Sequence, residues 1–259
     1  MTGVERCTPS PRDRRTPGRL PRRRIVNLWH RTAARIWRLG LRLKFTLFQQ
    51  HRHDAAVVEN LDGLTIQVLP GVFNPAIFRV TPVFLEWLAE DLVPPASTVL
   101  DVGTGTGVLA IAAARTAAGV TAVDRNPAAI ECARINARRN GVEDRVDLRL
   151  GDLFEPVAGE RFDLVLCNPP YLAGDPESEL EHALLAGDFP DRFARGLPGH
   201  LADGGRALVI LSDLGEQRRF LAAFDRAGLA AEAIRRRDLV SEVVTLYSVD
   251  SPSSGSRSR

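Results

Sequence analysis

The spacing of apolar residues changes along the chain, and each change predicts a strand or a helix. Short apolar runs recur from residue 98 onward, and between them apolar residues return at helical spacing. This alternation predicts an α/β fold with a mostly parallel sheet and helices on both of its faces. The last two runs have no helical stretch between them, so we expect the last strand to be antiparallel. The seven expected strands are Thr98–Leu100, Val120–Asp124, Val146–Leu150, Phe162–Cys167, Arg206–Leu211, Ala230–Arg235 and Val243–Val249.

A further strand and a helix are predicted before this sheet. Residues 64–68 read LTIQV, in which apolar and polar side chains alternate as in a half-buried strand, and Pro70-Gly71 ends it. We expect Thr81 to cap a helix that begins at Pro82 and ends before Pro94. Downstream helices are expected at residues 108–114, 127–140 and 215–227, and residues 177–201 are expected to be mostly helical.

The net charge of +2 conceals a strongly basic N-terminal segment. Residues 1–53 hold 14 Arg and Lys residues against two acidic ones, a balance of +12, whereas the remaining 20 basic and 30 acidic residues give −10. Thr8–Arg24 is rich in Pro and Arg and nearly devoid of apolar residues, which predicts disorder. From Ile25 apolar residues return at helical spacing with arginines on another face, which predicts a basic amphipathic helix. We therefore expect a disordered basic arm (1–24), the amphipathic helix (25–53), a strand and helix leading into the main domain (54–97), the main domain (98–250) and a disordered Ser/Arg tail (251–259).

Three roles are open for the amphipathic stretch at residues 25–48. It can pack its Trp and Leu face against the rest of the chain, bind an RNA backbone through its arginines, or lie on a membrane surface. Charges interrupt it too often for a transmembrane span, and no secretory signal is visible. We therefore expect a cytoplasmic protein.

Cysteine and histidine usage argues against a metal site. Cys7, Cys132 and Cys167 are an odd number without C-x-x-C spacing, which disfavours a disulfide framework and a thiolate zinc site. His51 and His53 form a pair with no third ligand candidate nearby. We expect no bound metal.

The most informative stretch is Thr98–Gly107, which reads TVLDVGTGTG. A strand runs directly into three alternate glycines, Gly103, Gly105 and Gly107, and an Ala-rich helical stretch follows. Glycine tolerates positive φ and lets a ligand approach the backbone, so the loop is expected to cradle a nucleotide-containing cofactor. The dinucleotide fingerprint G-x-G-x-x-G needs its third glycine where this chain has Val108, which disfavours NAD-type cofactors.

Carboxylates follow the next two strands, at the strand ends where ligands of doubly wound sheets bind. Asp124 ends the second strand, where its carboxylate can accept both hydroxyls of a ribose. Asp152 follows the third strand, where it can accept from an adenine amino group while Leu153 packs on the ring. Either acid alone could be a helix cap or a surface charge, but the two together with the glycine loop indicate a nucleoside site.

The fourth strand leads into Asn168-Pro169-Pro170-Tyr171. The two prolines fix two φ angles and remove two amide donors, so the local carbonyls are presented rigidly. The side-chain oxygen of Asn168 and the carbonyl of Pro169 are two acceptors suited to a planar NH2 group, and Tyr171 can stack on a flat substrate. Because the lone pair of such a nitrogen is delocalised, alignment and electrostatic help would carry the catalysis. The alternative is a purely structural Pro-Pro turn.

In order and spacing, these motifs resemble those of class I S-adenosylmethionine (SAM)-dependent methyltransferases of the small-domain type. That group includes the ribosomal RNA guanine-N2 and the release-factor glutamine-N5 methyltransferases. The resemblance runs from about Gly71 to Val249 and rests on DVGTGTG, AVDRNP, GDLFEP and NPPY. It implies a Rossmann-like fold, SAM as the cofactor of the main domain, and methyl transfer to a planar amino or amide nitrogen. The implied cofactor-binding residues are Asp101, Gly103, Thr104, Gly105, Thr106, Gly107, Asp124, Asp152, Leu153 and Asn168, and the implied catalytic residues are Asn168, Pro169, Pro170 and Tyr171.

The acceptor is open between RNA or a ribosomal component, a protein glutamine and a small molecule. PGVF at residues 70–73 is similar to the segment that opens the catalytic domain of the RNA guanine enzymes, but Arg79 and Thr81 stand where an acid and a glycine usually follow. Glu181–Leu184 partly matches the E-P-x-x-A-L stretch of the glutamine enzymes. The basic arm favours nucleic acid, whereas a body of net charge −10 suits a protein glutamine or an amine-bearing metabolite. Two other classes of protein are considered. Val108 disfavours an NAD-type oxidoreductase, and the intact NPPY sequence disfavours a SAM-binding regulator without turnover.

Overall fold

The structure is a computed structural model. It describes residues 55–170, 183–240 and 242–251. The predictions made for the basic arm, the amphipathic stretch, Tyr171 and the tail from residue 252 lie outside these residues. Within the described ranges, no helix combines the length and the apolar character that crossing a membrane requires.

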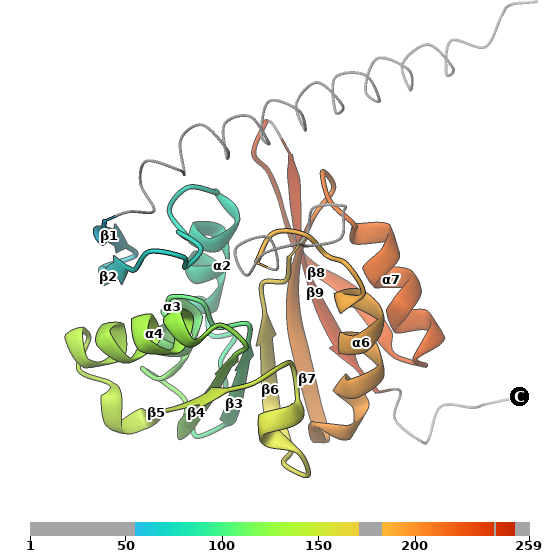
Figure 1. Cartoon of the computed structure of the whole chain (residues 1–259). Helices are drawn as coiled ribbons and strands as arrows, with labels where there is room; N and C mark the ends of the chain where they lie inside the picture. The colour runs from blue at the N-terminus through green and yellow to red at the C-terminus, as the bar shows by residue number, and fades with distance from the viewer. Residues whose placement is uncertain (1–54, 171–182, 241, 252–259) are drawn as a thin grey trace, which may run out of the picture. The chain divides into compact units, whose positions relative to one another are not determined.

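A seven-stranded sheet forms the centre of the described fold (Figure 1). Its strands are β3 (Thr98–Val102), β4 (Gly119–Asp124), β5 (Val146–Leu150), β6 (Phe162–Cys167), β7 (Leu201–Ser212), β8 (Ala230–Asp238) and β9 (Val243–Asp250). The spatial order is β5-β4-β3-β6-β7-β9-β8. Strand β9 runs antiparallel to β7 and β8, and the other neighbouring strands pair parallel. The predicted sheet, mostly parallel with an antiparallel last strand, is confirmed.

Helices cover both faces of the sheet (Figure 1). One face carries α2 (Val80–Leu88), α3 (Val108–Ala113) and α4 (Pro127–Arg139), and the other carries α6 (Phe189–Gly196) and α7 (Gln217–Arg226). Short 3-10 turns lie at Glu143–Arg145, Glu155–Val157 and Leu197–Gly199. Each face has its own buried apolar cluster, so the sheet is the shared wall of two cores.

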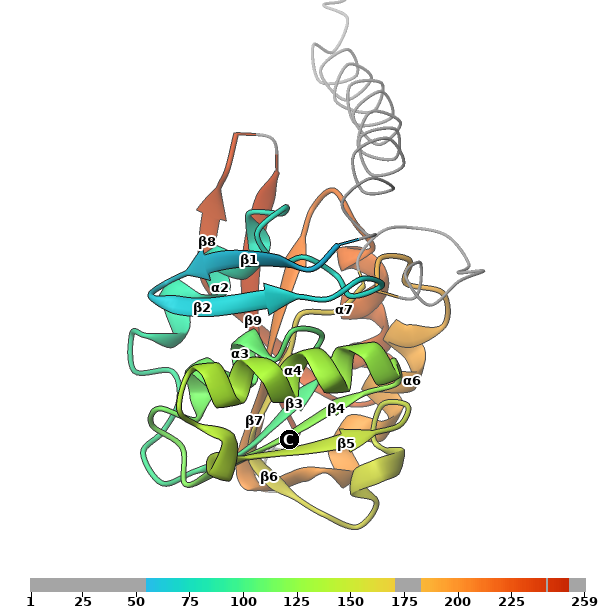
Figure 2. The same cartoon turned by 60° about the vertical axis from the view of Figure 1, so that its left-hand side comes forward.

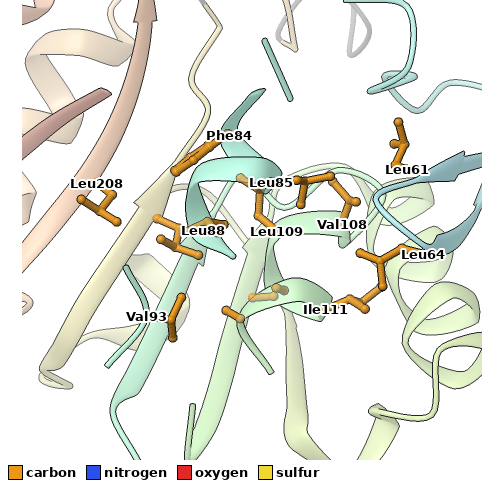
Figure 3. Packing of buried hydrophobic residues seen from close by; sticks show 14 of the residues in the cluster. Leu61, Leu64, Phe84, Leu85, Leu88, Val93, Val108, Leu109, Ile111 and Leu208 are labelled. Carbon is orange, nitrogen blue, oxygen red and sulfur yellow. The ribbon is translucent and has the colours of Figure 1, made fainter. Parts of the chain in front are cut away.

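A β-hairpin precedes α2, where the sequence predicted a single strand. Strands β1 (Val57–Leu61) and β2 (Leu64–Val68) pair antiparallel around Asp62 and Gly63, whose φ angles are 50° and 73°. Figure 2 shows the hairpin lying beside α4. Leu61 and Leu64 belong to the same buried cluster as residues of α2 and α3 (Figure 3).

Asn136 of α4 and Asn140, the C-cap residue of this helix, bond to the backbone of β2. The side-chain amide of Asn136 accepts from the Gln67 nitrogen at 2.7 Å and donates to the Gln67 carbonyl at 2.8 Å. Asn140, one turn later, forms the same pair with Thr65, at 3.2 and 3.0 Å. Since Thr65 and Gln67 are two residues apart, the two amides bond to β2 as a neighbouring strand would.

One local prediction, the helix cap at Thr81, is wrong, and another, the helical stretch at residues 177–201, is right only over residues 189–199. The helix α2 begins at Val80 with Arg79 as its N-cap, so Thr81 is inside the helix, 2% exposed, and its hydroxyl is used elsewhere. Residues 183–188 are not helical, and α6 begins only at Phe189. Pro190 explains this start, because a proline lacks the amide donor of a helix interior and fits the first turn. Leu201 opens β7, where it pairs with Phe162.

Candidate functional site

A cavity of about 360 Å³ opens at the carboxyl ends of the parallel strands. The strand order reverses between β3 and β6, and the crevice at such a reversal is where doubly wound sheets bind ligands. The cavity is lined by the loops that follow β3, β4, β5 and β6, by the segment before α2 and by the start of α6; these include Gly71–Phe73, Gly103–Thr106, Asp124–Asn126, Gly151–Leu153, Asn168–Pro170 and Ala186–Phe189.

The glycine loop after β3 is fixed by backbone hydrogen bonds. The amides of Gly103 and Thr104 both donate to the Val123 carbonyl, at 2.9 and 3.0 Å. Gly107 has φ 81°, and a Cβ there would lie 2.9 Å from the Cβ of Ala133 on α4. A side chain at position 107 would therefore be strained and would push α4 away. Gly103 and Gly105, with φ of 75° and 56°, line the cavity.

Asp101 lies beneath this loop, 1% exposed, and does not line the cavity. Its Oδ2 accepts from the Thr104 hydroxyl at 2.6 Å and from the Ala110 amide at 3.2 Å. Its Oδ1 has no hydrogen-bond partner among the described residues. Burial raises the pKa of Asp101 to about 7, against the lowering effect of these two hydrogen bonds.

Asp124 and Asp152 both line the cavity. The Asp124 carboxylate accepts from the Gly105 amide at 2.8 Å and from the Asn126 amide at 2.9 Å, so it connects the glycine loop to the start of α4. Asp152 accepts from Arg192 of α6 at 2.7 Å, and this ion pair raises the pKa of Arg192. Leu153 is 9% exposed and lies beside Asp152 on the wall.

Asn168 follows β6 and reaches back to α2. Its Nδ2 donates to the Thr81 hydroxyl at 3.1 Å, and its Oδ1 is buried with no hydrogen-bond partner among the described residues. Thr81, Asn168, Pro169 and Pro170 all line the cavity. The structure thus brings the predicted nucleoside-binding acids and the first three residues of the predicted acceptor motif to one cavity.

A family model described as the methyltransferase small domain matches residues 63–233, more than half of the chain. The chain belongs to this family. The predicted class of enzyme, a SAM-dependent methyltransferase, is thereby confirmed.

The chain is similar to several named methyltransferases. A release factor glutamine methyltransferase of Cereibacter sphaeroides is 42% identical over 158 residues, which are 55% of this chain and 56% of that protein. A ribosomal protein L11 methyltransferase of Pelotomaculum thermopropionicum is 39% identical over 170 residues, 64% of this chain and 49% of that protein. The chain thus matches about half the length of these two relatives.

Solved structures share the fold. A 16S rRNA N2 methyltransferase of Thermus thermophilus, in complex with AdoMet and guanosine, superposes with a TM-score of 0.58 at 22% identity, over 76% of this chain and 50% of that one. A methyltransferase from Pyrococcus furiosus gives a TM-score of 0.56 at 20% identity, over 82% and 99% of the two chains. The predicted Rossmann-like methyltransferase fold is confirmed.

Sequence reasoning missed Thr81 and Arg192, which line this methyltransferase cavity and hydrogen-bond to the predicted site residues Asn168 and Asp152. Thr81 was assigned to a helix cap, although a threonine followed by Pro82 could equally have been read as part of the first turn. Arg192 lies 40 residues beyond Asp152, and no local pattern links the two. Only the packing of α6 against the sheet brings this cation to the cavity.

Proposed function

We propose that the protein methylates the side-chain amide of a glutamine in a protein of the translation machinery, with SAM as the donor. The observation that carries the proposal is the unused, buried acceptor of Asn168 beside the cofactor cavity. The names of the relatives support the substrate class, because they act on release factor glutamine or on ribosomal protein L11.

The cavity residues fit SAM. Bound there, SAM would supply a methyl group on a positively charged sulfur. Each carboxylate oxygen can accept more than one hydrogen bond, so Asp124 can take ribose hydroxyls while it holds the Gly105 and Asn126 amides. Asp152 would accept from the adenine amino group, and Leu153 would pack on the ring. Gly103 and Gly105 leave the cavity wall without side chains, which allows a ligand to lie against the backbone.

The acceptor motif suits a planar NH2 group. Asn168 Oδ1 and the Pro169 carbonyl would each accept one of its hydrogens, hold the nitrogen in line, and turn its lone pair away from the amide plane. An amide nitrogen is a weak nucleophile, so this alignment and the added negative potential are the catalytic contribution. No strong base is needed before transfer. We assign Tyr171, which lies outside the described residues, to stacking on the acceptor.

One observation favours a second substrate class, RNA. Residues 1–53 carry a net charge of +12, and neutralisation of phosphates by Arg is the general source of nucleic-acid affinity. The rest of the chain, at −10, opposes a polyanion. We rank the protein glutamine first.

Transfer of a tritiated methyl group from SAM into cell extract tests the proposal. We expect label that protease removes and nuclease leaves, and label in purified release factor incubated with the protein. Asn168→Ala should lower this labelling about 100-fold while the SAM dissociation constant changes little, because a positioned transition-state acceptor is lost. Asp124→Ala should weaken SAM binding in calorimetry. Label lost with nuclease would establish RNA instead, and label that survives both treatments would indicate a small molecule.

A further inference from the structure

The chain contains three Asn-Pro sequences, and the third differs from the other two. Asn74 and Asn126 are each followed by Pro and then Ala, whereas Asn168 is followed by Pro169 and Pro170. In the first two, the asparagine Oδ1 accepts from the alanine amide two residues on, at 2.8 Å for Ala76 and 2.9 Å for Ala128. This is the usual local turn of an Asn side chain.

At Asn168 this local turn cannot form. The residue two positions on is Pro170, which has no amide hydrogen to donate. Asn168 Oδ1 is accordingly buried with no partner among the described residues, an arrangement that leaves a polar atom unsatisfied and is rare in a folded protein. Asn168 therefore lacks the local hydrogen bond that Asn74 and Asn126 both form.

The other end of the same amide is held. Asn168 Nδ2 donates at 3.1 Å to the hydroxyl of Thr81, a residue 87 positions earlier in α2 and only 2% exposed. An amide group is planar, and its oxygen and nitrogen are bonded to the same Cγ atom at a fixed angle. A bond that fixes Nδ2 on Thr81 therefore fixes the direction in which Oδ1 points.

We propose that Thr81 and Pro170 are positioning residues that keep Asn168 Oδ1 available to the substrate: Thr81 by holding the amide nitrogen, and Pro170 by withholding the local donor. The inference rests on the proposed function for the identity of the acceptor, but the state of the Asn168 amide can be measured without any acceptor.

Substitutions at Thr81 and at Pro170 test the two proposed positioning roles separately. Thr81→Val removes the hydroxyl at nearly constant volume, and Thr81→Ser keeps it as the matched control. Pro170→Ala restores an amide two residues after Asn168, so Oδ1 should turn to it as it does at Asn74 and Asn126. With SAM and release factor, we expect kcat to fall roughly 10- to 100-fold in Thr81→Val and in Pro170→Ala, with KM and the SAM dissociation constant within about threefold, because only alignment is lost. Thr81→Ser should retain most of kcat.

NMR of the asparagine side chains measures the state of the Asn168 amide directly. Its signals would not change if Thr81 and Pro170 only stabilised the fold. The chain has seven asparagines, so protein labelled with 15N at asparagine gives seven NH2 pairs, and Asn168→Asp identifies the one that matters. This pair should keep its shifts in Thr81→Ser and move in Thr81→Val. In Pro170→Ala, the amide introduced at position 170 should show the shift of a hydrogen-bonded donor.

The results of these experiments distinguish a failure of this inference from a failure of the proposed substrate. Unchanged kcat in Thr81→Val and Pro170→Ala, or an Asn168 pair that does not move, overturns the inference. A rise of the SAM dissociation constant equal to the fall of kcat makes Thr81 a cofactor ligand and overturns it as well. If the wild-type protein labels no release factor, the proposed substrate fails, and the NMR spectra alone then decide the inference.

Discussion

The protonation of the Asp101 side-chain carboxyl group is linked to folding. Its pKa of about 7 lies above the value of about 3.9 in an unfolded chain, so between these two the folded state binds more protons. The stability that the protonated group contributes is present below about pH 4 and is lost as pH rises through about 7, at up to about 1.4 kcal/mol per pH unit.

Asp101→Asn cannot ionise, so it should remove this pH dependence. Urea unfolding of both proteins at several values between about pH 5 and 8 would measure it. We expect the free energy of unfolding of the variant, relative to wild type, to rise with pH up to about 7. Two curves that run parallel over this range would contradict the assigned pKa.

At the scale of elements, α6 contributes a cation, Arg192, to the wall of the cofactor cavity. Arg192 pairs with Asp152 at 2.7 Å and fixes its carboxylate, while Arg195 is exposed on the same helix. Arg192→Met should therefore raise the SAM dissociation constant about three- to tenfold in calorimetry, and Arg195→Met should leave it unchanged. Tighter binding in Arg192→Met would mean instead that the arginine competes with the adenine amino group for Asp152.

The sequence predicted elements well where their signal is local. The alternation of apolar runs with helical spacing was sufficient, because the periods of strands and helices depend on neighbouring residues. The hairpin was missed although Asp62-Gly63, a strong two-residue turn signal, stands between β1 and β2. The length of α6 was overestimated because Ala and Leu at residues 183–186 have high helix propensity, which the turn before Pro190 overrides.

At the scale of the whole molecule, the sequence predicted the end of the sheet that carries the site but not the contacts across it. Asp124, Asp152 and Asn168 follow strands, and parallel strands bring their carboxyl ends to one edge. The bonds from Thr81 to Asn168 and from Arg192 to Asp152 join segments 87 and 40 residues apart, and no periodicity within one segment encodes them. Asp101 was predicted to bind the cofactor, but it is buried beneath the glycine loop and does not line the cavity. This position, too, results from packing between segments.

Asn136 joins the hairpin to the glycine loop, since its Nδ2 donates both to the Gln67 carbonyl and, at 2.9 Å, to the Thr106 carbonyl. Local opening of β2 and of the loop should therefore be coupled, and a ligand that stabilises the loop should slow amide hydrogen exchange in the hairpin. We expect SAM to slow exchange severalfold at the Gln67 amide in wild type and in Asn140→Ala. Among the described residues, the Asn140 side chain bonds only to Thr65 of β2 and to the Asn136 carbonyl. In Asn136→Ala the two segments should exchange independently of each other, so the hairpin would no longer report whether the cofactor is bound.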